Sequence, residues 1–133
     1  DDLHAAARLG ADIAFCLVGG RARARGIGEI IEPLPFVVLD LTLVIPPFTV
    51  STPAVYRAWD ALGGPRGPGL NDLEPAALQV APELAEWRDR IGELAGRPPT
   101  LAGSGATWFV EGHLRELEVL APAATVLFTR TRP

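Results

Sequence analysis

Residues 36–45 read FVVLDLTLVI and are followed directly by Pro46 and Pro47. β-Branched residues and leucines dominate this run, and both types favour strands that are buried on their faces. The two prolines end the run well short of the length that a membrane-spanning helix requires. We therefore expect a buried central strand here. We place a domain boundary just before it, which divides residues 1–35 from residues 36–133.

Helical patterns follow the predicted strand. Ser51 or Thr52 can cap a helix that carries Pro53 in its first turn, and Asn71 or Asp72 can cap a second helix. The remaining expected elements are a helix opened by Pro82, a strand over 107–110, a short helix over 114–120 and a strand over 125–129. This order of strands and helices predicts an α+β fold with helices on one face of a small sheet.

The region before the central strand shows a different pattern. An alanine-rich segment over 3–9 predicts a helix that Gly10 ends. Over residues 15–31, an apolar stretch is followed by Gly19 and Gly20, then by arginines that alternate with alanines, and then by Gly26 and Gly28. This pattern predicts two short strands around glycine turns. Cys16 lies in the apolar stretch, where a free thiol is expected to be a small buried hydrophobe.

Composition excludes several classes of protein. Hydrophobic residues make up 48% of the 133 residues and the net charge is −4, which indicates a folded domain without the basic stripe that nucleic acids require. No apolar run is long enough for a membrane span, so neither nucleic acid nor membrane is an expected partner. All 12 basic residues are arginine, and a single cysteine excludes an intramolecular disulfide. These features fit a cytoplasmic, reducing location.

Asp12 is the first candidate functional residue. It follows the end of the predicted first helix and is flanked by apolar residues. Backbone N–H groups could fix its carboxylate there and aim it into a cleft, which suits a general base or a positioning group. The structural alternative is an aspartate that caps a turn.

Glycine turns are the second kind of candidate. Gly103, Ser104 and Gly105 follow a predicted helix and precede a predicted strand, so their amides and hydroxyl could face a phosphate. A plain tight turn is the alternative for this loop. The same alternative applies to the segment over 26–28, which reads Gly-Ile-Gly and need be no more than a hairpin turn.

Tyr56 lies one helical turn beyond Thr52, so both side chains could face the same concavity at the end of the central strand. An aromatic ring in that position could stack on a nucleobase, and packing in the core is the alternative. His4 and His113 are far apart in the sequence, with no acidic or cysteine residue at ligand spacing. We expect no metal site built from protein side chains alone.

Six segments, taken in order, resemble one enzyme family. These segments are 9–15, 19–20, 26–29, 50–56, 71–74 and 103–107. Their order and spacing are similar to those of the 4-diphosphocytidyl-2-C-methyl-D-erythritol kinases, of the GHMP kinase superfamily. The resemblance reaches from Leu9 to about Val110, and it is the ordered set that makes it specific.

The resemblance implies transfer of the ATP γ-phosphoryl group, with Mg²⁺, to a hydroxyl of a cytidine-diphospho sugar alcohol in the non-mevalonate route to isoprenoid precursors. Asp12 matches the catalytic aspartate of the family. Ile27 and Thr52 match residues of the cytidine pocket, and Tyr56 matches the aromatic residue that stacks on cytosine. The loop over 103–105 matches the third glycine motif, near the phosphates and the substrate.

The resemblance also implies that part of the enzyme is missing. The catalytic lysine and the long loop that holds ATP in the family would both lie before the first residue of this chain. Residues 1–35 would then be a remnant of the amino-terminal lobe, and residues 36–133 the carboxy-terminal lobe, a ferredoxin-like sheet with helices on one face. The missing half of the same kinase becomes an expected partner. The alternative is an independent, non-catalytic nucleotide-binding module derived from such a kinase.

Overall fold

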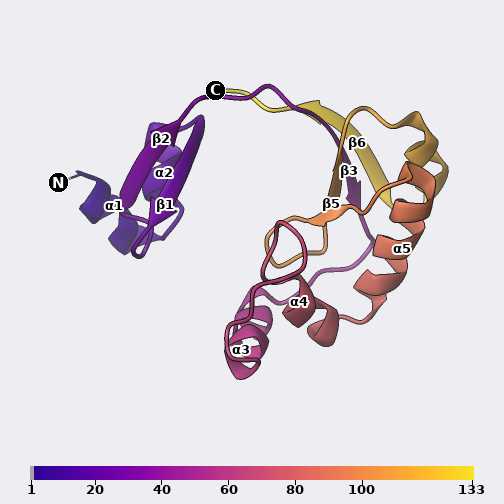
Figure 1. Ribbon diagram of the computed structural model, residues 1–133, viewed down its shortest axis with the longest axis horizontal. Helices are drawn as coiled ribbons and strands as arrows, with labels where there is room; N and C mark the ends of the chain where they lie inside the picture. Colours follow the sequence, from indigo (N-terminus) through magenta and orange to yellow (C-terminus); the bar gives the residue numbers. More distant parts are fainter. Residues whose placement is uncertain (1) are drawn as a thin grey trace. The chain divides into compact units, whose positions relative to one another are not determined.

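The computed structural model describes residues 2–133, and these form two compact units. The first unit runs to Leu39 and includes Arg130–Pro133, and the second is Asp40–Thr129. The elements, drawn in Figure 1, are α1 (Asp2–Leu9), α2 (Ile13–Val18), β1 (Arg21–Arg25), β2 (Ile30–Leu34), β3 (Asp40–Ile45), α3 (Thr52–Ala61), α4 (Glu74–Val80), α5 (Glu83–Ala95), β4 (Thr100–Leu101), β5 (Trp108–Glu111), the 3-10 helix η1 (Arg115–Leu120) and β6 (Thr125–Arg130). The predicted α+β class is confirmed.

The second unit is built on a four-stranded sheet with the order β4-β5-β3-β6. β5 pairs antiparallel with both β3 and β4, and the register places Val44 opposite Trp108. Burial alternates along β3 and β5, so that Thr42, Val44, Trp108 and Val110 are buried. This period of two means that one face of the sheet carries the core. Leu84 and Ile91 of α5 belong to the same buried cluster.

Local signals explain the ends of the helices in this unit. Ser51 Oγ accepts a hydrogen bond from the Ala54 N–H at 3.4 Å, which confirms the predicted start of α3. α5 ends at Gly96, whose φ of 69° is the left-handed conformation that glycine adopts readily. The predicted cap of α4 is wrong. α4 follows Leu73 without a side-chain cap. The Asn71 amide oxygen accepts from the Leu73 N–H, and its amide nitrogen donates to the carbonyls of Leu101 and Gly103.

The central strand is shorter than the sequence predicted. β3 begins at Asp40, and residues 36–39 group with the first unit, whereas the sequence placed the boundary after residue 35. The reason is a set of contacts with the carboxy-terminal segment. The Leu39 N–H donates to Thr131 Oγ1 at 2.8 Å, the Thr131 N–H donates to the Leu39 carbonyl at 2.9 Å, and Thr131 Oγ1 donates to the Val37 carbonyl at 3.0 Å.

The first unit contains α1, α2 and the antiparallel hairpin of β1 and β2, with α2 packed against β2 (Figure 1). The sequence predicted extended structure from Phe15, but Ile13–Val18 is helical. Gly19 ends this helix with a φ of 72°, and its N–H donates to the Phe15 carbonyl at 2.8 Å. The predicted burial of Cys16 is also wrong, because only Ala14 of this short helix is buried.

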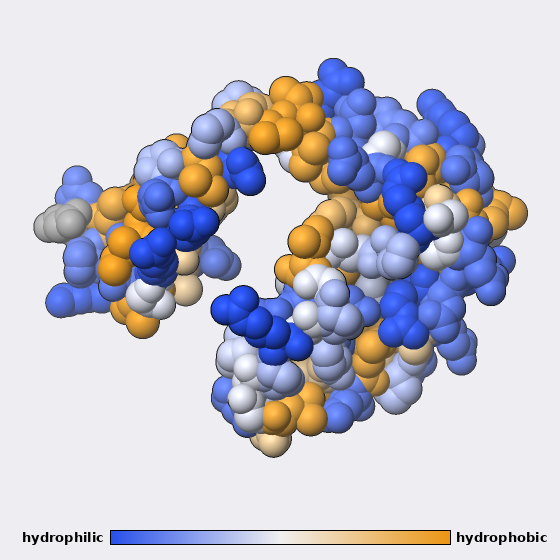
Figure 2. Space-filling model, in the orientation of Figure 1, coloured by the Kyte–Doolittle hydropathy of each residue, from blue (hydrophilic) through white to orange (hydrophobic). Residues whose placement is uncertain are grey.

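The two units differ in what they bury. The buried hydrophobic residues of the first unit are alanines, Ala6, Ala7 and Ala14, whereas its larger apolar side chains reach the surface. Leu17, for example, is 64% exposed. Figure 2 shows apolar surface interspersed with polar surface over these elements. Among the described residues, no helix has the length and apolar character needed to cross a membrane.

Candidate functional site

Asp12 and Ile27, which are distant in the sequence, line one cavity in the first unit. The cavity has a volume of about 450 Å³, and its wall is formed by Ala11, Asp12, Ala24, Arg25, Gly26, Ile27 and Gly28. The wall therefore combines the turn before α2 with the end of β1 and the loop that follows it. Ile27 is 67% exposed, so its side chain is available for contact with a ligand.

The Gly26–Gly28 loop has a conformation that requires glycine. Gly26 and Gly28 have φ values of 71° and 104°. The Glu29 carboxylate accepts a hydrogen bond from the Ile27 N–H at 2.7 Å, which holds the tip of the loop. A Cβ atom at Gly28 would collide with the Ala11 carbonyl oxygen. The close approach of this loop to the turn that carries Asp12 therefore depends on the absence of a side chain.

Asp12 occupies the residue before α2, with helical backbone angles of φ −85° and ψ −12°. The sequence analysis suggested that backbone N–H groups would hold its carboxylate, but the side chain makes no capping hydrogen bond. Its backbone carbonyl accepts from the Cys16 N–H at 3.0 Å. The residue is exposed, so its carboxylate borders the cavity without being used by the helix.

The second unit carries three further predicted site residues, Thr52, Tyr56 and Ser104. Thr52 Oγ1 and Ser104 Oγ are 2.7 Å apart and hydrogen bonded, which joins the start of α3 to the glycine loop. Tyr56 follows Thr52 by one helical turn and is 50% exposed. An aromatic side chain that is half exposed can stack on a planar ligand, and a core role would require deeper burial.

The Gly103–Gly105 loop connects β4 to β5 and has φ values of 58° at Gly103 and 97° at Gly105. Some groups that the sequence predicted to face an anion already have partners in the protein. The Gly105 N–H donates to the Ala102 carbonyl at 3.0 Å, and the buried Ser104 shares its hydrogen bond with Thr52. The structure therefore shows a loop that is held firmly in place.

Asn71 is a part of this region that sequence reasoning assigned to a different role. Its Nδ2 donates to the Leu101 carbonyl at 2.8 Å and to the Gly103 carbonyl at 2.6 Å. Its Oδ1 accepts from the Leu73 N–H at 3.0 Å. The sequence presented Asn71 as a candidate helix cap and as the first residue of one of the six segments of the resemblance, and neither signal specified that its side chain contacts the glycine loop.

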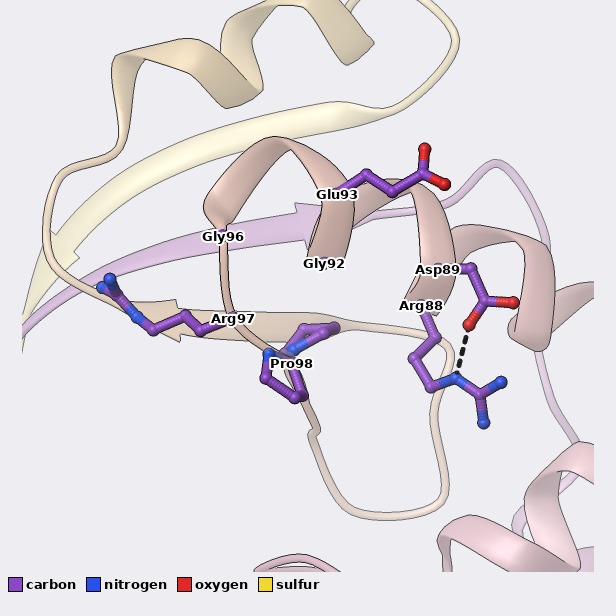
Figure 3. Close-up of a pocket in the computed structure, with 8 residues that line it drawn as sticks. Arg88, Asp89, Gly92, Glu93, Gly96, Arg97 and Pro98 are labelled. Carbon is purple, nitrogen blue, oxygen red and sulfur yellow. Dashed lines mark hydrogen bonds and ion pairs between the residues drawn. The ribbon is translucent and has the colours of Figure 1, made fainter.

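A cavity of about 540 Å³ lies elsewhere in the second unit, along the second half of α5 and the residues after it (Figure 3). Its lining residues are Arg88, Asp89, Gly92, Glu93, Gly96, Arg97, Pro98 and Pro99, and none of them was a predicted site residue. Arg88 Nε donates to Asp89 Oδ1 at 2.9 Å, and Arg97 Nη2 donates to the Glu111 carbonyl. Because both guanidinium groups bond to the protein, this cavity is a weaker candidate for an anion site.

Glu74, at the start of α4, is a carboxyl group with a perturbed pKa. Burial raises the pKa of its carboxyl group above 4.5, and the Arg88 guanidinium, with Nη1 at 3.8 Å from Glu74 Oε1, opposes this shift. Within residues 2–133, His, Cys, Asp and Glu form no group of three or more that could hold a metal ion.

The fold matches that of a small-molecule kinase. A solved structure described as the crystal structure of 4-(cytidine 5'-diphospho)-2C-methyl-D-erythritol kinase superposes on 98% of this chain with a TM-score of 0.76 and 32% identity. The match covers 56% of the solved chain. At this identity and coverage, the likeness extends beyond general topology. No family model matches the chain.

Curated relatives point to the same enzyme. The 4-diphosphocytidyl-2-C-methyl-D-erythritol kinase of Thermus thermophilus is 38% identical over 125 residues, which cover 81% of this chain and 46% of the relative. The kinase of the same name from Pelotomaculum thermopropionicum is 37% identical, over 97% of this chain and 54% of the relative. The chain is therefore a homologue of the 4-diphosphocytidyl-2-C-methyl-D-erythritol kinases, as the sequence predicted, and it spans about half the length of the curated relatives it matches.

Proposed function

We propose that this chain is the substrate-binding part of a kinase that uses ATP to phosphorylate 4-diphosphocytidyl-2-C-methyl-D-erythritol in the non-mevalonate route to isoprenoid precursors. The observation that carries the proposal is the structural match to a kinase of that name over 98% of the chain. We propose further that residues 1–35 derive from the amino-terminal lobe, that residues 36–133 form the carboxy-terminal lobe, and that the enzyme acts in the cytoplasm.

Asp12 is the proposed catalytic residue. Its exposed carboxylate borders the cavity formed with the Gly26–Gly28 loop, and its helix does not use it as a cap. In the proposed reaction, this carboxylate orients the substrate hydroxyl and accepts its proton as the oxygen becomes a nucleophile. Ile27, exposed in the same wall, contributes apolar contact to the cytidine moiety.

The second unit carries the other proposed substrate contacts. Tyr56 presents a half-exposed ring that can stack on cytosine, and Thr52 lies one turn before it. The Gly103–Gly105 loop, joined to Thr52 through Ser104, is the proposed contact for the phosphate groups. Contacts of this kind would position the substrate, and positioning supplies much of the rate in phosphoryl transfer.

ATP and Mg²⁺ do not fit the residues of this chain alone. The sequence contains no lysine to pair with the transferred phosphoryl group, and arginine has a different geometry. In the described part of the chain, acidic, histidine and cysteine side chains form no cluster of three or more that is suited to a cation. We therefore propose that the phosphoryl donor is held by the amino-terminal half of the same kinase, as the partner of this chain.

A chimera tests the proposal. The 133 residues would replace the matching part of the Thermus thermophilus kinase, and ATP-dependent phosphorylation of 4-diphosphocytidyl-2-C-methyl-D-erythritol would be measured. We expect turnover by the chimera and none by the isolated chain. Asp12→Asn in the chimera should keep substrate binding and lower kcat by about a hundredfold or more.

Two results would contradict the proposal. Robust turnover by the isolated chain would show that the missing half is dispensable. A folded chimera that binds the cytidine-diphospho substrate without turning it over would favour the non-catalytic nucleotide-binding module instead.

A further inference from the structure

We propose that Asn71 is a positioning residue that holds the Gly103–Gly105 loop in the shape that binds the phosphate groups of the ligand. The inference rests on the proposed function for the nature of the ligand. The role of Asn71 itself rests on three hydrogen bonds of its side chain, which lie within the second unit.

The Asn71 side chain uses both ends of its amide. A primary amide offers two N–H donors and one carbonyl acceptor. In Asn71, Nδ2 donates to the carbonyls of Leu101 and Gly103, and Oδ1 accepts from the Leu73 N–H. The side chain therefore ties the segment before α4 to the end of β4 and to the first residue of the glycine loop.

The glycine loop needs such external support. Glycines lose more conformational freedom on ordering than other residues, and both Gly103 and Gly105 adopt positive φ. Asn71 holds the Gly103 carbonyl on one side, and Thr52 holds the Ser104 hydroxyl on the other, at 2.6 and 2.7 Å. Two adjacent residues of the loop are thus fixed from two different segments, which sets the orientation of the backbone between them.

Asn71 acts through the loop and is not assigned any contact with the ligand. Its role differs from that of Tyr56, whose ring is proposed to contact the base. Loss of Asn71 should therefore weaken recognition of phosphate groups and leave recognition of the nucleoside nearly unchanged. A general loss of stability would weaken both kinds of recognition together.

The decisive variant is Asn71→Asp in the 133-residue chain. Aspartate keeps the shape and the acceptor for the Leu73 N–H, but it places a carboxylate oxygen against the carbonyls of Leu101 and Gly103. Asp72→Asn is the matched control. It also changes the charge by one and keeps the acceptor that Asp72 offers to the Gly67 N–H at 2.9 Å.

Two measurements would be made on the wild type and both variants. The first is hydrogen exchange of individual backbone amides by NMR, and the second is the Kd for cytidine 5'-diphosphate and for cytidine. In Asn71→Asp, we expect amides of residues 101–106 to exchange about tenfold faster or more. We expect the Kd for cytidine 5'-diphosphate to rise by about tenfold and that for cytidine to stay within about twofold. Asp72→Asn should behave like the wild type.

The inference is overturned if Asn71→Asp leaves amide exchange in the loop unchanged. It is also overturned if the variant weakens binding of cytidine and of cytidine 5'-diphosphate by the same factor. Failure of the proposed function gives a different result. A wild-type chain that binds neither compound contradicts the assigned ligand, while a loop-confined response to Asn71→Asp still supports the role of Asn71 in holding the loop.

Discussion

The two units of this chain differ in the size of the apolar side chains that they bury. The second unit contains a hydrophobic core in which strands and helices contribute fully buried side chains, such as Val44, Leu84 and Trp108. The first unit has regular helices and a hairpin, but the hydrophobic side chains it buries are alanines. Burial of large apolar side chains supplies most of the favourable free energy of folding. We therefore expect the second unit to hold most of the stability.

This difference also separates the candidate site residues. Thr52 and Ser104 hydrogen bond to each other within the unit that contains the packed core. Asp12 and Ile27 depend on the close fit of a glycine loop against a turn. The four predictions below test this comparison, and they run from the largest expected effect to the smallest.

Trp108→Ala should cause the largest loss. Trp108 is fully buried in the central part of the sheet, and its removal should cost about 3–5 kcal/mol of unfolding free energy. Its indole Nε1 has no hydrogen-bond partner in the described part of the chain, so the loss should come from packing alone. Trp108→Phe should therefore keep most of the stability, as measured by urea unfolding.

Leu17→Ala is the matched control in the first unit. Because Leu17 is largely exposed, the change should alter the unfolding free energy by less than about 0.5 kcal/mol. Comparable losses for Trp108→Ala and Leu17→Ala would contradict the view that the core of the second unit dominates stability.

Gly28→Ala tests the close fit in the first unit. Alanine disfavours a φ of 104°, and its Cβ would collide with the Ala11 carbonyl oxygen. We expect a local cost of up to about 3 kcal/mol, measured as faster hydrogen exchange in the β1–β2 hairpin. Gly19→Ala, at a φ of 72° with nothing near its Cβ position, separates backbone strain from the collision. Equal effects of the two changes would show that the contact with Ala11 is unimportant.

Tyr56→Ala tests whether an exposed side chain of the second unit serves binding. In the chimera, this change should weaken binding of the cytidine substrate by about 1–3 kcal/mol of binding free energy. Tyr56→Phe should bind the substrate nearly normally, because stacking needs the ring and not the hydroxyl. The affinity for ATP and the melting temperature should change little, since Tyr56 is half exposed. A lower melting temperature together with loss of both affinities would instead indicate a packing role.

Glu74→Gln should give the smallest effect, and it should depend on pH. Because burial raises the pKa of Glu74 in the folded state, ionisation of this carboxyl favours the unfolded state. The contribution of Glu74 to stability is therefore present below pH 4.5, the ordinary pKa of the group. It declines as the pH rises through the higher pKa of the folded state. Glu74→Gln should remove this decline. The melting temperature of the variant should therefore be slightly above that of the wild type at neutral pH, but not at acidic pH.

Melting temperatures from about pH 3.5 to pH 8 would check this prediction. A variant that is less stable than the wild type only at neutral pH would show that the ion pair with Arg88, at 3.8 Å, outweighs the cost of burial. Arg88→Gln serves as the complementary variant, because it should raise the pKa of Glu74 further.

The sequence by itself determined the α+β class, most of the helices, the hairpin after Gly20 and the resemblance to the kinases. These features depend on short-range patterns, such as the Ser51 cap of α3 and the run of β-branched residues and leucines over 36–45. It missed the helix over 13–18, whose apolar residues in a short run fit helix and strand equally well.

Only the tertiary structure decided which distant residues meet. Asn71 contacts carbonyls 30 and 32 residues away, and Thr52 contacts a hydroxyl 52 residues away. Periodicity and capping rules describe neighbours within about four positions along the chain, so they contain no information on such pairs. The exposure of Cys16 was decided in the same way, because burial depends on what packs against a helix and not on the apolar residues beside it.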